Sequence, residues 1–411
     1  MGARSVGVTV LWPLASDSWG DEETAAIARV LRGGRRTMGA EVAAYERELA
    51  DFVGARHAVA VNSGSSANLL MVAALRYHSR HRLALGDEVV APAVAWSTTY
   101  APLAQHGLKI RLVDVDPETF NARPEDLLAA VGPETRAVLA VHVLGNPCRI
   151  DELGAALPEN VVLIEDACDA LGAALGGRHC GTFGLAGTFS TFFSHQITTG
   201  EGGVLVTDDD ELYHLALVLR AHGWTRDLPE PNALAVRGVD PRSEPGASGF
   251  AERFRFILPG YNLRPTEMQA AAGRVQLVKL PAMVAARQAN ARRVHAYLND
   301  APWVKPQRPV GNWSPLALGM IVDAGAPVGR AGLVEAFEAR GIDTRPVLAG
   351  NIVRSEMAAH LDLSADPLPG ADAVHRRGLA IGNLGDDLSY DQIGAFSGAL
   401  RAAAPERHLR R

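Results

Sequence analysis

Short apolar runs alternate with longer segments of helical periodicity in the first half of the chain. The runs, which predict strands, are residues 57–62, 88–91, 109–114, 137–143 and 161–165. The segments between them, which predict helices, are residues 67–75, 98–105, 124–131 and about 150–156. Most of these strands are apolar on both faces, which is typical of a parallel sheet covered by helices. The pattern predicts an α/β layered domain with its ligand at the carboxyl ends of the strands.

Further elements are expected on either side of this alternation. Before it, residues 21–33 begin with acidic side chains and end at a glycine, and residues 40–52 carry apolar side chains at helical spacing, so both predict helices. After it, strands are expected at residues 189–193 and 204–208, and helices at residues 211–222, 266–277 and 280–298.

The later part of the chain changes in character. Residues 227–249 are rich in proline, glycine and serine, which predicts a long loop of the kind that forms lids or contacts partners. Residues from about 300 onward predict a smaller α+β lobe. We therefore predict a large cofactor-binding domain at residues 1–285 and a small C-terminal domain at residues 286–411.

Composition narrows the class of protein. A net charge of −6 over 411 residues gives no basic surface for nucleic acid or an anionic membrane. No apolar run reaches the roughly 18–20 residues that a membrane helix needs. The three cysteines, at irregular spacing, predict a reducing cytoplasm rather than a disulfide framework, and no metal site is expected.

Polar residues follow several of the predicted strands. Gly64 and Ser65 lie in a polar turn before a helix, where they would either bind an anion or form an ordinary helix cap. Trp96 lies beyond another strand end, where an indole either stacks on a ligand ring or packs in the core. Asp166 ends a buried, acidic strand, and a structural ion pair is the alternative to a ligand contact there.

The most distinctive run is residues 187–203. An apolar strand that includes Ser190 leads to Ser194-His195, and a threonine- and glycine-rich turn follows before the next strand. An imidazole moves protons near neutral pH, so His195 is a candidate acid–base residue, and a satisfied histidine at a turn is the alternative.

This run resembles the segment that carries the cofactor-linked lysine in the DegT/DnrJ/EryC1/StrS family of pyridoxal-phosphate (PLP)-dependent sugar aminotransferases. His195 stands in place of that lysine, as in the family branch of nucleotide-sugar 3-dehydratases, and Gln196 stands where related chains often have a second histidine. The resemblance covers roughly residues 20–400. It implies a fold-type I PLP-dependent transferase fold, with a mostly parallel seven-stranded sheet and a smaller C-terminal α+β domain.

The same resemblance implies roles for individual residues. Asp166 would pair with the cofactor's pyridine nitrogen, Trp96 would cover its ring, and His195 would be the catalytic residue. The remaining cofactor contacts would be Gly64, Ser65, Ser190 and Asn262. Ser194, Arg345 and Asn351 would face the substrate. Because the Asn262 segment is one that reaches the neighbouring subunit's site in the family, a homodimer with shared active sites is expected.

The implied activity is removal of the C3 hydroxyl from a nucleotide-linked 4-keto-6-deoxyhexose by the pyridoxamine phosphate (PMP) form, with glutamate restoring the cofactor amine. The chain has only three lysines, Lys109, Lys279 and Lys305, and none is at the cofactor position. Three alternatives remain: aminotransfer with His195 as base, a non-catalytic cofactor-binding protein, and an iron–sulfur-dependent dehydratase. The last takes four cysteine ligands, one more than this chain has.

Overall fold

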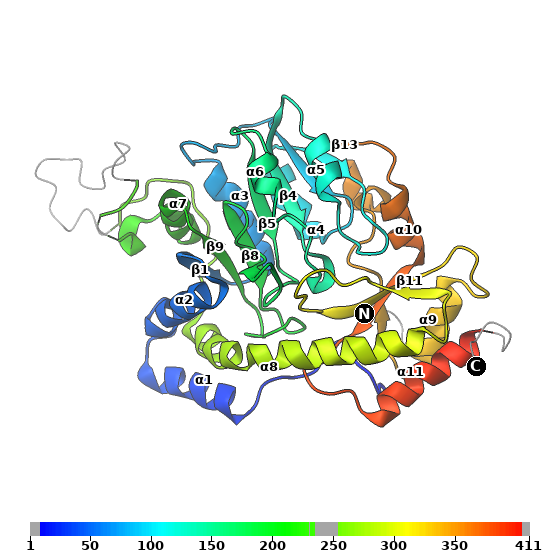
Figure 1. Ribbon diagram of the computed structural model, residues 1–411. Helices are drawn as coiled ribbons and strands as arrows, with labels where there is room; N and C mark the ends of the chain where they lie inside the picture. Colours follow the sequence, from blue (N-terminus) through cyan, green and yellow to red (C-terminus); the bar gives the residue numbers. More distant parts are fainter. Residues whose placement is uncertain (1–8, 230, 235–253, 405–411) are drawn as a thin grey trace, which may run out of the picture.

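The computed structural model describes residues 9–229, 231–234 and 254–404 (Figure 1). Most of the loop expected at residues 227–249 lies outside the described residues. The described chain forms a large lobe around one central sheet and a smaller lobe built around a second sheet (Figure 1).

Eight strands form the central sheet, in the order β1-β9-β8-β5-β4-β2-β3-β13. Their bounds are β1 (His57–Val61), β2 (Glu88–Pro92), β3 (Lys109–Val113), β4 (Thr135–Val141), β5 (Val162–Asp166), β8 (Ala186–Ser190), β9 (Gly203–Thr207) and β13 (Leu363–Ala365). Every neighbouring pair from β8 to β13 is parallel, and β9 runs antiparallel to both of its neighbours. The predicted seven strands are confirmed, and β13 adds a short eighth at the edge.

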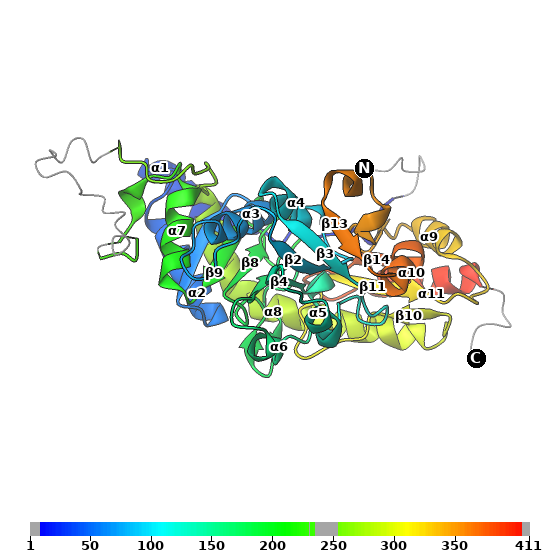
Figure 2. The ribbon, with the colours of Figure 1, turned by 90° about the horizontal axis from the view of Figure 1, so that it is seen from above.

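Alternate residues of the strands enter cores on opposite faces of the sheet. On one face, Val59 and Val61 of β1 pack with α3 (Gly64–Leu75), α4 (Ser97–Gln105) and α7 (Asp210–Arg220). On the other face, Ala58 and Ala60 pack with α2 (Ala40–Val53) and α8 (Glu267–Leu298), while α5 (Pro124–Ala129) and α6 (Leu153–Ala156) cover β2, β4 and β5. The view from above shows these layers, with α3 and α4 on one side of the strands and α5, α6 and α8 on the other (Figure 2).

Helix α8 is a single helix, so the prediction of two helices at 266–277 and 280–298 is wrong at the break between them. It begins with a capping box between Thr266 and Gln269 and passes through Pro281. A proline inside a helix removes one backbone hydrogen bond. Packing outweighs that loss, because α8 contacts α1 (Asp21–Gly33) and α2 at one end and reaches the small lobe at the other (Figure 1).

The small lobe has an antiparallel sheet in the order β10-β11-β14-β12. Its elements are β10 (Val304–Pro306), β11 (Ala317–Val322), β12 (Thr344–Arg345), β14 (Gly378–Gly382), α9 (Arg330–Glu338), α10 (Pro369–Arg377) and α11 (Tyr390–Ala403). Trp12, from the start of the chain, is fully buried in this lobe and donates its indole N–H to Gly382 O at 2.9 Å. The predicted domain boundary at 285/286 falls inside α8 and stays a prediction.

Three local features differ from the expectations. The strand predicted at 189–193 is β8, which begins earlier, at Ala186. It also ends earlier, because the chain turns after Ser190 instead of continuing in the sheet. A hairpin of β6 (Ala174–Leu175) and β7 (Arg178–His179) was not predicted, although Gly176 and Gly177 both take left-handed backbone angles at its turn. Short 3₁₀ turns span Val143–Gly145, Thr225–Asp227, Ile352–Arg354 and Glu356–His360. Among the described residues, no helix combines the length and apolar character that a membrane crossing requires.

Candidate active site

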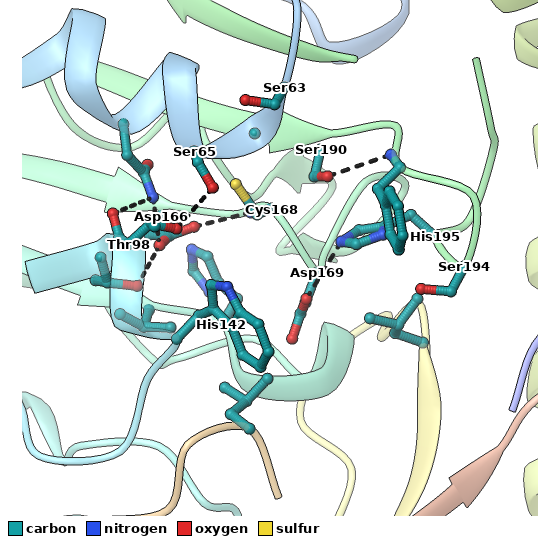
Figure 3. A pocket seen from close by; sticks show the side chains of 18 of the residues that line it. Ser63, Ser65, Thr98, His142, Asp166, Cys168, Asp169, Ser190, Ser194 and His195 are labelled. Atoms are coloured by element: carbon teal, nitrogen blue, oxygen red, sulfur yellow. Dashed lines mark hydrogen bonds and ion pairs between the residues drawn. The ribbon is translucent and has the colours of Figure 1, made fainter. Parts of the chain in front are cut away.

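A cavity of about 510 Å³ lies at the carboxyl ends of the parallel strands, where the sheet meets the small lobe. Its walls come from the ends of β1, β2, β4, β5 and β8 and from β12 of the small sheet. Eight of the ten residues proposed from the sequence line it: Gly64, Ser65, Trp96, Asp166, Ser190, Ser194, His195 and Arg345 (Figure 3).

Asp166 is the last residue of β5 and lies on the floor of the cavity, 5% exposed. Its Oδ2 accepts hydrogen bonds from Asn68 Nδ2 at 2.8 Å and Thr99 Oγ1 at 2.7 Å. Its Oδ1 accepts the backbone N–H of Cys168 at 3.2 Å. The carboxylate is therefore fixed by neutral donors, and no cationic side chain of the described residues is bonded to it, which leaves its negative charge available to a cationic ligand group.

The N-terminus of α3 faces the same cavity. Ser63 caps the helix by accepting the backbone N–H of Ser66, and Ser65 Oγ lies 2.8 Å from Thr98 Oγ1. A Cβ on Gly64 would lie 2.6 Å from Cβ of Ser190 and 2.9 Å from its Oγ. The helix-cap interpretation is confirmed by the Ser63 contact, and anion binding at the amide end of α3, which lines the cavity, stays a prediction.

Trp96 is 55% exposed on the cavity rim, just before α4. The alternative of core packing is excluded by this exposure. A large exposed indole over a polar cavity has an open face for a flat ligand ring.

His195 lies across the cavity from Asp166, with its side chain 14% exposed (Figure 3). Its Nδ1 is buried and has no hydrogen-bond partner among the described residues, and its Nε2 lies 3.7 Å from Asp169 Oδ1. Burial, and then the positive charges of Arg345 and Arg287, lower the pKa of the imidazole to about 3. The alternative of a satisfied histidine does not describe this residue.

His142 provides the contrast, because it lines the same cavity and is fully bonded. Its Nδ1 accepts the backbone N–H of Cys148 at 2.9 Å, and its Nε2 donates to Glu165 Oε2 at 3.0 Å. Glu165 also accepts the backbone N–H groups of Gly181 and Gly184. This pair is therefore a structural support for the wall behind Asp166.

Several cavity residues were not singled out as site residues from the sequence. Asn68 and Thr99 orient Asp166, and Asp169 faces His195. Burial raises the pKa of the Asp169 carboxyl to about 6, against the opposing effect of Arg345. Asn68 and Thr99 could have been proposed from the sequence, since each lies in the first turns of a helix that follows a strand.

Two proposed residues do not line the cavity of their own chain. Asn351 is 2% exposed; it caps a short 3₁₀ turn and donates to Asp372 Oδ1 at 2.9 Å. Its polar atoms are used within the fold, which corrects the expectation that it faces the substrate. Asn262 is exposed on the surface, where its Oδ1 accepts from Arg264.

No lysine lines the cavity, although Lys279 lines an adjoining pocket that shares Ser194 and His195 with it. Lys109 pairs with Glu134 at 2.8 Å, Lys279 with Glu22 and Glu23, and Lys305 with Asp323. All three lie within the described ranges, and none lines the cavity. A cofactor in this cavity would have no amine of this chain to bond with.

The donor groups of the cavity fit a phosphorylated pyridine cofactor. It offers a carboxylate for a ring nitrogen, an indole for a ring face, and a helix end with serine hydroxyls for a phosphate. A side chain at Gly64 would overlap Ser190, so glycine is required where the N-terminus of α3 approaches β8.

The fold and this site define a fold-type I PLP-dependent enzyme. The chain belongs to the DegT/DnrJ/EryC1/StrS aminotransferase family, whose profile matches residues 17–398. It is 42% identical over 386 residues to a GDP-4-keto-6-deoxy-D-mannose 3-dehydratase of Yersinia pseudotuberculosis, covering 93% of this chain and 96% of that protein. The predicted family and fold are confirmed.

Solved structures agree. A mutant of GDP-4-keto-6-deoxymannose-3-dehydratase with bound GDP-perosamine superposes with a TM-score of 0.89 at 41% identity, covering 95% of this chain and all of that chain. The same enzyme with a trapped PLP-glutamate geminal diamine gives equal values.

Proposed function

We propose that this protein is a PLP/PMP-dependent 3-dehydratase that acts on a nucleotide-linked 4-keto-6-deoxyhexose, with GDP-4-keto-6-deoxymannose as the first substrate to test. The observation that carries the proposal is His195 in a cavity with the donor groups for the cofactor and no lysine in its lining, while Lys279 of the adjoining pocket is paired with Glu22 and Glu23. The relatives' substrate, and the GDP-sugar and glutamate bound in their structures, support the choice of GDP-sugar and of glutamate as amino donor.

Residues of this chain would hold the cofactor from three sides. Asp166 would pair with the ring nitrogen, Trp96 would cover the ring, and Gly64, Ser65 and Ser190 would surround the phosphate. When bound, the cofactor supplies an amine for the sugar ketone and a ring that accepts electrons.

His195 would move the protons. A lysine at this position makes the covalent link on which aminotransfer depends, whereas an imidazole only accepts and donates protons. His195 would accept a proton beside the reacting carbon and return it to the departing C3 hydroxyl, which leaves as water. Arg345 and Ser194, on the same side of the cavity, would contact the substrate.

The overall reaction balances with glutamate as reductant. The sugar loses its C3 oxygen and keeps its ketone, while glutamate becomes 2-oxoglutarate and releases its nitrogen as ammonia. Aminotransfer gives 2-oxoglutarate as well, but its nitrogen remains on the sugar and no ammonia is formed. Product nitrogen and free ammonia therefore separate the two reactions.

The test is to incubate the protein with PLP, glutamate and a panel of nucleotide-linked 4-keto-6-deoxyhexoses, and to measure sugar mass, 2-oxoglutarate and ammonia. We expect a 3-deoxy-4-keto product with equal amounts of 2-oxoglutarate and ammonia, and none from the His195→Asn variant. An amino sugar without ammonia would mean aminotransfer. No conversion, with a cofactor spectrum unchanged by glutamate, would mean a non-catalytic protein.

A homodimer with shared sites, working in the cytoplasm, is part of the proposal. Asn262 is exposed and does not line its own chain's cavity, which suits a contact across a subunit interface. Cys148, Cys168 and Cys180 are all free thiols, which suits a reducing compartment. The three-cysteine count also disfavours the iron–sulfur alternative.

A further inference from the structure

We propose that Asp169 and His195 act as a carboxylate–imidazole pair, and that Gln196 is the positioning residue that holds this pair together. The inference rests on the proposed function for its kinetic consequences, and on contacts of the chain itself for its geometry. Neither Asp169 nor Gln196 has a function in the site as described so far.

The surroundings of His195 explain why it needs an anionic partner. Arg287 of α8 donates to the backbone carbonyl of His195 at 3.2 Å, and Arg345 of β12 lies on the same side of the cavity. Both guanidinium groups oppose a positive charge on the imidazole, and so does burial. An imidazolium formed during proton transfer would therefore be unstable without a nearby negative charge.

Asp169 is the carboxylate that faces the ring. Its Oδ1 lies 3.7 Å from His195 Nε2, which is an ion-pair distance longer than a normal hydrogen bond. At 3.7 Å the two groups attract one another electrostatically without sharing a hydrogen bond. The other nearby carboxylate, Asp166, is held by Asn68 and Thr99 on the opposite side of the cavity (Figure 3).

Asp169 is itself held from two sides. Its Oδ2 accepts the backbone N–H of Leu144 at 3.1 Å, which leaves Oδ1 directed toward His195. Its backbone carbonyl accepts a hydrogen bond from the side chain of Gln196. Gln196, which follows His195 in the sequence, is therefore hydrogen-bonded to Asp169, which faces the His195 ring.

Gln196 also bonds the segment of Ser314, which leads into β11 of the small lobe. It is 1% exposed, and its Nε2 donates to Ser314 O at 2.9 Å as well as to Asp169 O. Ser314 in turn bonds the chain at Gly145 and Leu171. The side-chain amide of Gln196 therefore connects three segments, which carry His195, Asp169 and Ser314.

The pair explains how His195 can accept a proton near neutral pH although its pKa is strongly lowered. When the imidazole of His195 takes a proton, the Asp169 carboxylate compensates the new positive charge, and the imidazole then gives a proton to the departing hydroxyl. Burial raises the pKa of Asp169 to about 6, so its carboxyl is mostly ionised near neutral pH and can supply this negative charge. Burial in the same environment thus raises the pKa of Asp169 and lowers the pKa of His195.

Gln307 offers a matched control. It is a glutamine with 1% exposure, and its Nε2 also donates to two backbone carbonyls, Thr119 O and Val143 O. Its Oε1, like that of Gln196, has no partner among the described residues. Substitutions at the two positions remove the same number of bonds in the same kind of environment. Gln196 bonds Asp169 directly, whereas Gln307 reaches it only through the Val143–Leu144 peptide group, whose N–H donates to Asp169 Oδ2.

The kinetic test compares Asp169→Asn, Gln196→Glu and Gln307→Glu in the full-length protein with PLP, glutamate and the GDP-sugar. We expect kcat to fall by about 100-fold for Asp169→Asn and about 10-fold for Gln196→Glu, with KM changed by less than about threefold. Gln307→Glu should stay within about twofold of wild type. Gln196→Met and Gln307→Met repeat the comparison without a new charge, should a glutamate prevent folding.

A second readout needs no turnover. In the cofactor-free protein, the carboxyl carbon of Asp169, assigned with Asp169→Asn, is titrated by NMR. We expect His195→Asn and Gln196→Met each to move its midpoint by about half a pH unit or more, and Gln307→Met to leave it in place. A midpoint indifferent to His195→Asn, or equal kinetic losses at positions 196 and 307, would overturn the proposal. Because this titration is independent of the reaction, it stands or fails separately from the dehydratase activity.

Discussion

At the scale of single residues, Asp169 links the active site to the stability of the protein. Its pKa is raised from 3.8 to about 6 by burial, so between these values the folded chain keeps a proton that the unfolded chain has released. Stability from this group is therefore complete below about pH 4 and is lost as pH rises through 6. Asp169→Asn should remove the loss and gain up to roughly 3 kcal/mol over wild type at pH 7.5, relative to pH 4.

Urea unfolding of the cofactor-free protein across this pH range measures the effect. Asp51→Asn, at an exposed position of α2, is the control and should leave the pH dependence of unfolding unchanged. If Asp169→Asn and wild type show parallel curves from pH 4 to 7.5, the carboxyl is not buried as the structure has it. A variant with lower activity and higher stability would show that this site is built at a cost to the fold.

Individual residues also show how much of the candidate site could be predicted from the sequence. Asp166, Trp96 and His195 were found because each follows a strand end or belongs to a distinctive run. Asp169 and Gln196 were not assigned, because their contact joins residues 27 positions apart through a side chain and a backbone carbonyl. Asn351 was misjudged for the opposite reason, since an asparagine in a loop serves a turn as readily as a substrate.

At the scale of elements, the N-terminus of α3 gives the next prediction. A methyl group at Gly64 would meet Ser190 Cβ at 2.6 Å and Cys168 Sγ at 3.1 Å. Gly64→Ala should therefore push β8 away from α3, cost about 1–3 kcal/mol in the free energy of unfolding, and weaken cofactor binding by about tenfold or more. Titration with PLP followed by absorbance measures the affinity, and thermal melts without cofactor measure the fold.

Gly394 of α11 is the control, because a Cβ there meets nothing within 4 Å. Gly394→Ala should stabilise the helix by about 0.5–1 kcal/mol and leave PLP affinity unchanged. Unaltered affinity in Gly64→Ala would mean that the phosphate is bound elsewhere in the cavity.

Elements were predicted well where one period governed the segment. The buried strands of the central sheet and helices such as α1 lie close to their expected bounds, because apolar runs and caps are local signals. The break expected in α8 failed because contacts with both lobes, which are not local, override the proline at 281. Strand β13 could not be predicted either, since three residues become a strand only by pairing with β3.

At the scale of the whole molecule, the proposed dimer allows two defective chains to restore one another. If each site takes His195 from one subunit and Asn262 from the other, a heterodimer of His195→Asn and Asn262→Ala chains has one site with both defects and one with neither. Random exchange makes half of the dimers mixed, so about a quarter of the wild-type activity should return. Each variant alone should be far less active.

The pairing of variants decides which contacts cross the interface. Asp166 and His195 line one cavity of a single chain, so a mixture of Asp166→Asn and His195→Asn should recover nothing, because each mixed dimer has one defect in each site. Recovery in the first mixture and none in the second, after unfolding and refolding the chains together, identifies Asn262 as a residue that acts across the interface. Equal failure of both mixtures would place Asn262 outside the partner's site, and the cavity of one chain would then have to be complete in itself.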